Sequence, residues 1–358
     1  LTYIGAGRLR QAAELLRQTG SHRVLVMTTP GMMRRGQLDQ TLSELQENGM
    51  EAVVFDRVSP DPTFGVVEEA VSCAAGCDAI LAVGGGSVLD AAKTAAAAIA
   101  NHKPAEKLVG TLKVKKQPML LIAVPTTAGT GSETTIAAVI SETATHRKRQ
   151  ILDPKLVPFA AILDPELTVG LPQGNTIHTA MDALTHAIEG YTTKAAWEMT
   201  DMFHLEAIKL ISENLRGAVQ NTPEGREGMA LGQYIAGMGF SNVGLGIDHA
   251  MAHTLSAHYD TPHGVACAML LPIAMEFNKP VCAERLAKVA AAMGVDTTGM
   301  STDEAADAAI AAVKQLSADV NIPHVCEAMK ADEIEVLAKD AMADACFPGN
   351  PREATLDD

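Results

Sequence analysis

The stretch ILAVGGGSVLDAAKTAAAAI, residues 80–99, decides the fold class of this chain. Four apolar residues at 80–83 run directly into three glycines and a serine, and an alanine-rich segment follows. This order predicts a buried strand, a loop and then a helix over 88–99. Glycine lets the backbone approach a ligand closely, and a helix start offers N–H groups to a phosphate. The loop lacks the common G-x-G-x-x-G spacing, so it indicates phosphate binding with only moderate specificity.

The rest of the first half repeats this alternation of short apolar runs and helical segments. Predicted strands cover residues 24–28, 52–55, 80–83, 119–124, 137–140 and 160–163, and predicted helices cover 37–48, 66–75 and 88–99. The strands lack the alternation of apolar and polar residues that is typical of a half-exposed sheet. Such runs predict a parallel sheet covered by helices on both faces, which is the doubly wound, Rossmann-like α/β architecture.

The texture of the sequence changes after LDPELTVGLP, residues 163–172. Strand patterns end there, and long helical patterns cover residues 177–191, 197–220, 226–240, 247–258 and 301–317. We therefore expect an α/β N-terminal domain over residues 1–167 and an all-helical C-terminal domain over residues 168–358.

The composition excludes several classes of protein. A formal net charge of −15 argues against nucleic-acid binding, because phosphate contacts require clustered Lys and Arg. The six cysteines are not spaced as a disulfide framework, which is typical of a reducing compartment. We expect no signal peptide, and the longest apolar run, residues 264–275, is too short to span a bilayer. The sequence therefore predicts a cytoplasmic protein without membrane or nucleic-acid partners.

One carboxylate and three imidazoles form the candidate chemical centre. Asp182 and His186 lie four residues apart in MDALTHAIEGY, so a helix would place them on one face. His249 and His263 lie near the two ends of DHAMAHTLSAHYDTPHG. This donor set suits a divalent first-row metal such as iron or zinc. The alternative is four unrelated polar residues in an alanine-rich region, although seven of the eleven histidines fall between His178 and His263.

A second loop, PTTAGTGSE at residues 125–133, also follows a predicted strand. Its hydroxyls and glycines could approach a diphosphate or a ribose closely. Because the carboxyl ends of parallel strands share one edge of a sheet, two such loops predict a common ligand site. Asp90 and Lys93 follow the first loop: one interpretation places Asp90 beside the ligand, and the other makes them a capping carboxylate and a solvated lysine.

Together these motifs resemble the iron-containing (group III) alcohol dehydrogenases, over almost the whole chain. The resemblance rests on GGGSVLDAAK, PTTAGTGSETT, AILDPELTVGLP, MDALTHAIEGY and GLGIDHAMAHTLSAHYDTPHG. It implies that the first domain holds NAD or NADP, that the second holds Fe(II), with Zn(II) as the alternative, and that the cleft lies between them. It also implies a homo-oligomer, a dimer or larger.

Site residues carry over from the family by position. The four metal ligands map to Asp182, His186, His249 and His263, and a proton-relaying histidine maps to His253. The pocket-lining aromatic residue maps to Phe240. The nucleotide-contacting positions map to Gly84, Gly85, Gly86, Ser87, Asp90, Thr126, Thr127, Thr130, Ser132 and Lys148. His253 shares a predicted helix face with His249, and the other interpretation of it is a helix histidine bound to a backbone carbonyl.

One departure from the family bears on the cofactor. Many NAD-preferring members have an acidic residue at the end of the first strand, where this chain has Thr29. A neutral residue removes a charge that would repel a 2′-phosphate, so NADP use or relaxed preference is open. Arg34 and Arg35 lie nearby, and the plainer interpretation makes them surface residues.

The expected reaction is hydride transfer between a short primary alcohol or diol, or its aldehyde, and a nicotinamide. Ile136, Ala137 and Phe240 are apolar, which suits a small substrate. Two other functions stay open at this point. One is a metal- and NAD-dependent lyase or cyclase of the dehydroquinate-synthase-like fold, and the other is a metal-dependent hydrolase, which leaves the glycine-rich loops unexplained.

Overall fold

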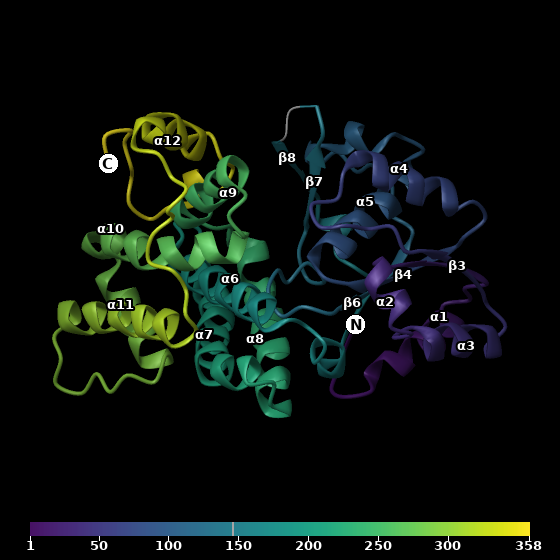
Figure 1. Ribbon diagram of the computed structural model, residues 1–358, viewed down its shortest axis with the longest axis horizontal. Coiled ribbons are helices and arrows are strands. Elements are labelled where there is room, and N and C mark those ends of the chain that lie inside the picture. The colour runs from purple at the N-terminus through teal and green to yellow at the C-terminus, as the bar shows by residue number, and fades with distance from the viewer. Residues whose placement is uncertain (145–146) are drawn as a thin grey trace. The chain divides into compact units, whose positions relative to one another are not determined.

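A computed structural model describes residues 1–144 and 147–358 of the chain (Figure 1). Contacts between residues divide it into two compact units. The first comprises residues 1–127 and 132–170, and the second comprises residues 128–131 and 171–358. The domain boundary expected between residues 167 and 168 stays a prediction. The expected domains did not include an exchange such as residues 128–131, which precede the boundary but belong to the second unit.

The first unit is built on a six-stranded parallel sheet with strand order β1-β9-β6-β4-β2-β3. Its strands are β1 (Thr2–Ile4), β2 (Arg23–Met27), β3 (Glu51–Phe55), β4 (Ala79–Gly84), β6 (Leu120–Pro125) and β9 (Ala160–Leu163). Every residue of β4 is buried, as its uninterrupted apolar sequence predicts. The parallel α/β sheet confirms the predicted fold class.

Helices pack on both faces of this sheet, because alternate side chains of each strand point to opposite sides. Leu25 and Met27 belong to one apolar core, with α4 (Phe64–Cys73) and α5 (Gly86–Asn101). Val24 and Val26 belong to the other, with α1 (Gln11–Gln18), α2 (Pro30–Arg34) and α3 (Asp39–Glu47). The sheet is therefore doubly wound.

A second, three-stranded sheet corrects one expectation. It contains β5 (Gly110–Thr111), β7 (Ala137–Glu142) and β8 (Arg147–Leu152), in the order β5-β8-β7. The strand expected at residues 137–140 lies here, antiparallel to β8, so assigning it to the parallel sheet was wrong. Its burial gives the reason: Ala138 and Ile140 are buried while Ala137 and Val139 are partly exposed, the alternation of a half-exposed antiparallel strand.

The second unit is helical, as predicted. Its helices are α6 (Gln173–Thr192), α7 (Glu198–Val219), α8 (Pro223–Val243), α9 (Ile247–Tyr259), α10 (His263–Ala292), α11 (Thr302–Asp319) and α12 (Ile334–Met342). One continuous apolar core joins α6, α7, α8, α10 and α11. Within the unit α7 packs against α8, and α10 packs against α6, α9 and α11.

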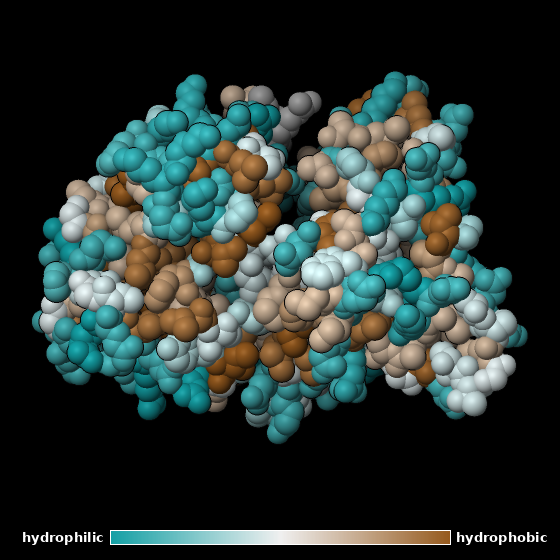
Figure 2. Space-filling model, turned by 180° about the vertical axis from the view of Figure 1, so that it is seen from behind, coloured by the Kyte–Doolittle hydropathy of each residue, from teal (hydrophilic) through white to brown (hydrophobic). Residues whose placement is uncertain are grey.

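Helix α10 is longer than the apolar run at residues 264–275 suggested. By length and composition alone α10 could cross a membrane, but 56% of its apolar 18-residue stretch is buried inside the structure. The core helix of a soluble protein can have the same length and composition, so these two properties are weak evidence for a membrane-spanning helix. Pro280 precedes a kink at Cys282, where the backbone leaves helical geometry. On the face drawn in Figure 2, hydrophilic and apolar side chains are interspersed.

Candidate metal centre and nucleotide loops

Three helices bring the four predicted ligands together in the second unit. Helix α6 carries Asp182 and His186 one turn apart, α9 carries His249 in its first turn, and His263 is the first residue of α10. Each of the three imidazoles points Nε2 at the same atom, Asp182 Oδ1. The separations are 3.7 Å for His186, 3.6 Å for His249 and 3.4 Å for His263.

This spacing fits donors arranged around one divalent ion. Two atoms that each lie about 2.1 Å from a tetrahedrally coordinated metal stand roughly 3.4 Å apart. Asp182, His186 and His249 are buried, whereas the His263 side chain is 29% exposed. The centre is therefore accessible from the side on which His263 lies.

Three of the four predicted ligands have the protonation states that metal binding needs. Burial lowers the pKa of His186 to about 3 and also lowers the pKa of His263. Burial alone would raise the pKa of Asp182, but the imidazoles of His186 and His263 hold it well below its ordinary value. Neutral imidazoles and an ionised carboxylate are the forms that coordinate metals.

His249 is held between two carboxylates. Its Nδ1 lies 2.7 Å from Glu189 Oε2, while its Nε2 faces Asp182. Burial alone would lower the pKa of His249, but Cys267 and the carboxylates of Asp182 and Glu189 together raise it well above its ordinary value. The site thus favours a positive charge at the point where Nε2 meets Asp182.

Glu189 also fixes the start of α9, since Gly246 at the N-cap has no side chain to offer. Its carboxylate accepts hydrogen bonds from the backbone N–H of Asp248 at 2.8 Å and of His249 at 3.3 Å. A carboxylate that orients the far nitrogen of a liganding histidine sets the tautomer of the ring. Glu189 therefore positions His249 through both its ring and its backbone.

His253 lies one turn beyond His249 on α9. Its ring stacks on His263 with centroids 5.2 Å apart, and its Nδ1 lies 2.9 Å from Asp344 Oδ2. This partner is a side-chain carboxylate, so the contact does not support the interpretation of His253 as a histidine bound to a backbone carbonyl. Its side chain is 27% exposed, on the accessible side of the cluster.

Phe240, the predicted pocket residue on α8, stacks on the other side of the cluster. Its ring centroid lies 4.2 Å from that of His186, with nearly parallel planes. His186 in turn stacks on His249 at 4.6 Å. Phe240 is partly exposed, so it offers an apolar surface beside the centre.

Both predicted nucleotide loops begin at the ends of neighbouring strands of the first unit. β4 ends at Gly84 and β6 at Pro125, and these residues pair across the sheet. The backbone N–H of Thr126 donates to the carbonyl of Gly84 at 3.0 Å. A Cβ on Gly84 would lie 2.4 Å from Val88 Cγ2, so a side chain there would clash, and one on Gly85 would lie 3.1 Å from Thr127 Cγ2, a tight contact.

Asp90 and Lys93 hold this end of the sheet together. Asp90 accepts hydrogen bonds from Ser132 Oγ at 2.6 Å and from the backbone N–H of Val139 at 3.0 Å. It does not cap α5, whose N-cap has no side-chain hydrogen bond. Lys93 is 1% exposed and donates to the carbonyls of Thr135 and Ala137, so the solvated-lysine interpretation was wrong. Burial lowers the pKa of Lys93 to about 8.

The other predicted cofactor residues have local partners. Thr29 is the N-cap of α2 and accepts a hydrogen bond from the backbone N–H of Met32. Lys148, on β8, pairs with Asp61 at 3.0 Å. Gly86 begins α5 and Ser87 follows it, at the helix start where a phosphate would be bound. Thr130 belongs to the segment of residues 128–131 in the second unit.

Comparison with known families decides the identity of the chain. The model of iron-containing alcohol dehydrogenases matches residues 2–165, and the model of the C-terminal domain of the same family matches residues 176–358. The chain belongs to the iron-containing alcohol dehydrogenase family. It is an oxidoreductase, and members of this family use iron and NAD(H).

Several members resemble the chain over nearly its whole length. Lactaldehyde reductase of Escherichia coli K12 is 40% identical over 364 residues, which cover 99% of this chain and 95% of the relative. A crystal structure of 1,3-propanediol oxidoreductase superposes with a TM-score of 0.97 at 37% identity, covering 100% of this chain and 95% of that one. Sulfoacetaldehyde reductase from Bifidobacterium kashiwanohense, solved in complex with NAD+, has a TM-score of 0.91 at 28% identity, covering 99% and 94%.

Sequence reasoning missed three residues that lie against the histidine cluster in the structure. Glu189 lies three residues after His186 on the same helix face, so the spacing could have revealed it. Asp344 lies 91 residues from its partner His253, and no local pattern connects the two. Cys267, one turn after His263, was grouped with the other cysteines.

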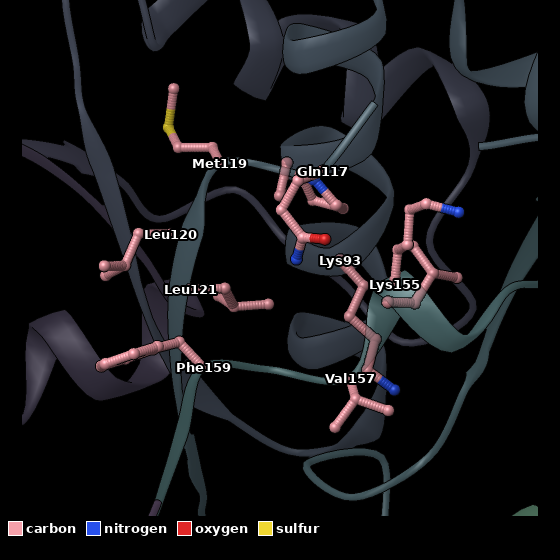
Figure 3. Close-up of a pocket in the computed structure, with 11 residues that line it drawn as sticks. Lys93, Gln117, Met119, Leu120, Leu121, Lys155, Val157 and Phe159 are labelled. Atoms are coloured by element: carbon pink, nitrogen blue, oxygen red, sulfur yellow. The ribbon is translucent and has the colours of Figure 1, made fainter. Parts of the chain in front are cut away.

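The first unit also contains a cavity that is separate from the nucleotide loops. It has a volume of about 230 Å³ and is lined by Lys93, Leu121, Val157 and Phe159 among others (Figure 3). Leu121 and Phe159 lie at the amino ends of β6 and β9. Ligands of parallel α/β sheets bind beyond the carboxyl ends, so this cavity is not where the cofactor is expected.

Proposed function

We propose that this family member is an iron-dependent, NAD(P)-linked dehydrogenase that interconverts a short primary alcohol or diol and its aldehyde. The observation that carries the proposal is the convergence of three imidazole Nε2 atoms on Asp182 Oδ1, at 3.4 to 3.7 Å. We assign Asp182, His186, His249 and His263 as the residues that hold the metal. When bound, the metal would polarise the alcohol oxygen, and the nicotinamide would accept the hydride.

His253 is the group that we assign to proton transfer. Asp344 accepts a hydrogen bond from Nδ1, which directs the other ring nitrogen, Nε2, to exchange a proton with substrate or water. The partial exposure of His253 and His263 marks the side of the cluster that the substrate reaches. Phe240 supplies an apolar wall, and its contact with His186 favours a small substrate over a bulky one.

The substrate class is drawn from relatives and site together. The names lactaldehyde reductase and 1,3-propanediol oxidoreductase both specify a short substrate with more than one oxygen atom. We therefore infer short diols and hydroxyaldehydes as the first substrates to examine. The lyase, cyclase and hydrolase alternatives are not favoured, because these relatives are oxidoreductases.

We propose that the dinucleotide lies along the loops after β4 and β6. The proposed contact residues are Thr29, Gly84, Gly85, Gly86, Ser87, Asp90, Thr126, Thr127, Thr130, Ser132 and Lys148. The α5 N-terminus favours a phosphate through its N–H groups and its dipole. Thr29 carries no charge that would repel a 2′-phosphate, so we expect NADP to be accepted beside NAD.

Reduction of NAD and of NADP, followed by nicotinamide absorbance over a panel of short alcohols and diols, tests this function. Thr29→Asp is the informative variant, because Asp caps helices as well as Thr does and so preserves the start of α2. The account predicts that this variant loses NADP turnover and keeps NAD turnover. An unchanged cofactor ratio would remove Thr29 from the cofactor site, and no turnover with any alcohol would refute the proposed substrate class.

We also propose a cytoplasmic homo-oligomer. All six cysteines are free thiols in the structure, which suits a reducing compartment. Light scattering of the purified protein measures the assembly directly, and a monomer at micromolar concentration would contradict this proposal.

A further inference from the structure

A buried thiol lies against the predicted metal ligands. Cys267 is one turn after His263 on α10 and is 0% exposed. Its Sγ lies 3.6 Å from His263 Nε2, 3.9 Å from His249 Nε2 and 3.9 Å from Asp182 Oδ1. The thiol is therefore aimed at the same point on which the imidazoles converge.

The distance of 3.6 Å to His263 is that between two ligands of one ion. A sulfur about 2.3 Å and a nitrogen about 2.1 Å from one tetrahedral ion stand roughly 3.6 Å apart. Among the described residues, one donor atom each from Asp182, His249, His263 and Cys267 lie within 4.8 Å of one another, in a group that leaves out His186.

The fourth predicted ligand, His186, lies outside this group. Its Nε2 has the longest separation from Asp182 Oδ1, 3.7 Å, and its ring is stacked between Phe240 and His249. The centre thus contains five donors in two overlapping sets. One set uses only nitrogen and oxygen, and the other exchanges His186 for the sulfur of Cys267.

We propose that Cys267 is a ligand when Zn(II) or Co(II) fills the centre, joining Asp182, His249 and His263, while Fe(II) takes the nitrogen and oxygen set that includes His186. The chemistry follows ligand softness: thiolate favours zinc and cobalt in tetrahedral sites, and carboxylate and imidazole suffice for Fe(II). The inference rests on the proposed metal centre. It makes Cys267 a residue that determines which metal the enzyme retains.

The coordination step balances without an additional reactant. The Cys267 side chain enters the step as a thiol, and the thiolate is the form of cysteine that binds metals. When the metal–sulfur bond forms, the S–H bond breaks, the proton leaves to solvent and the sulfur lone pair becomes the donor. No electron is transferred, and the metal keeps its oxidation state.

Cobalt loading of the metal-stripped full-length protein tests the proposal by a readout other than activity. Thiolate bound to Co(II) gives a charge-transfer band in the near ultraviolet that imidazole and carboxylate ligands do not give. The wild-type protein with one equivalent of Co(II) should show this band. Cys267→Ser should bind Co(II), seen in its visible ligand-field spectrum, and should lack the band.

Two further variants identify the sulfur and the donor set. Cys346→Ser is the matched control, because Cys346 lies near His253 and Asp344 in the same unit. The band should survive in Cys346→Ser and also in His186→Ala, since the sulfur-containing set does not use His186. Loss of the band in Cys346→Ser would show that Cys346, and not Cys267, supplies the sulfur, and would overturn the proposal. Loss of the band in His186→Ala with Co(II) still bound would overturn the arrangement of two donor sets.

Metal competition measures the consequence. Cys267→Ser should lower the affinity for Zn(II) relative to Mn(II) by about tenfold or more. An unchanged ratio, or a wild-type protein that binds one Co(II) without the band, would overturn the role of Cys267 and leave the metal centre standing. A folded wild-type protein that binds no Co(II) would overturn the centre itself, so the two failures are distinguishable.

Discussion

Replacing Glu189 by Gln is the substitution that probes the support of the metal centre most sharply. The carboxylate accepts from three N–H groups: the backbone of Asp248, and the backbone and Nδ1 of His249. A carboxamide has one oxygen, so its NH₂ group must face a donor or turn toward Nδ1. If it donates to Nδ1, the ring proton moves to Nε2, the atom that has to bind the metal.

The expected loss follows from what the change leaves in place. Packing is conserved because Gln has the shape of Glu, and only the charge and one acceptor disappear. Loss of a carboxylate that orients a liganding histidine costs about 10- to 100-fold in metal affinity, or about 1.4–2.7 kcal/mol. Competition with a chromophoric chelator measures this affinity on the metal-stripped protein.

A matched control is available in the same unit. Glu276 is 53% exposed and pairs with Lys314, so Glu276→Gln should leave the metal affinity unchanged. If Glu189→Gln folds with the far-ultraviolet circular dichroism of the wild type and binds metal within twofold of it, Glu189 does not set the tautomer of His249, and the reasoning is refuted.

Three other outcomes follow from the second unit. Gly239→Ala would place a Cβ 2.3 Å from His204 Nε2, so urea unfolding should show a loss of about 1–3 kcal/mol in the free energy of unfolding. Gly174→Ala, whose Cβ would make only an ordinary contact with His178 Cε1 at 3.9 Å, should not destabilise the protein, and equal effects of the two substitutions would contradict the packing account. Burial lowers the pKa of His204 to about 3. The imidazole of His204 takes up a proton below about pH 6.5 in the unfolded chain but stays neutral in the folded protein. Lowering the pH from 7 to 5 should therefore reduce the free energy of unfolding by about 2 kcal/mol through this residue. If His204→Gln keeps the pH dependence of the wild type, this explanation is wrong. Asp344→Asn replaces the carboxylate beside His253 Nδ1 by an amide, so it should lower kcat about tenfold or more and alter the pH profile of kcat, with KM unchanged. A rise in KM by the same factor would indicate a role of Asp344 in substrate binding instead.

The fold was largely predictable because its central strands are uniformly apolar. Buried β4 and β6 have no polar face, and such runs separated by helices have few solutions other than a parallel sheet. The strand expected at residues 137–140 was assigned to the wrong sheet, because all four side chains are apolar and only the pairing with β8 shows which of them are exposed. Strand β1, only three residues long, has no pattern that sequence could reveal.

The site divides in the same way. Asp182 and His186 share a helix face, and their spacing alone indicates that they lie together. Asp344 reaches His253 only through the tertiary fold. Lys93 could be interpreted as a solvated lysine, because its position in an alanine-rich helix does not reveal the backbone carbonyls to which it donates.

The most direct test of the account is an anaerobic titration of the metal-stripped protein with Fe(II), followed by nicotinamide reduction in the presence of a short diol. The account predicts that the rate rises in proportion to added metal and reaches its plateau at one equivalent, and that His263→Ala shows no such rise. Full activity before any metal is added, or a rate that Fe(II) does not change despite stoichiometric binding, would contradict the central claim.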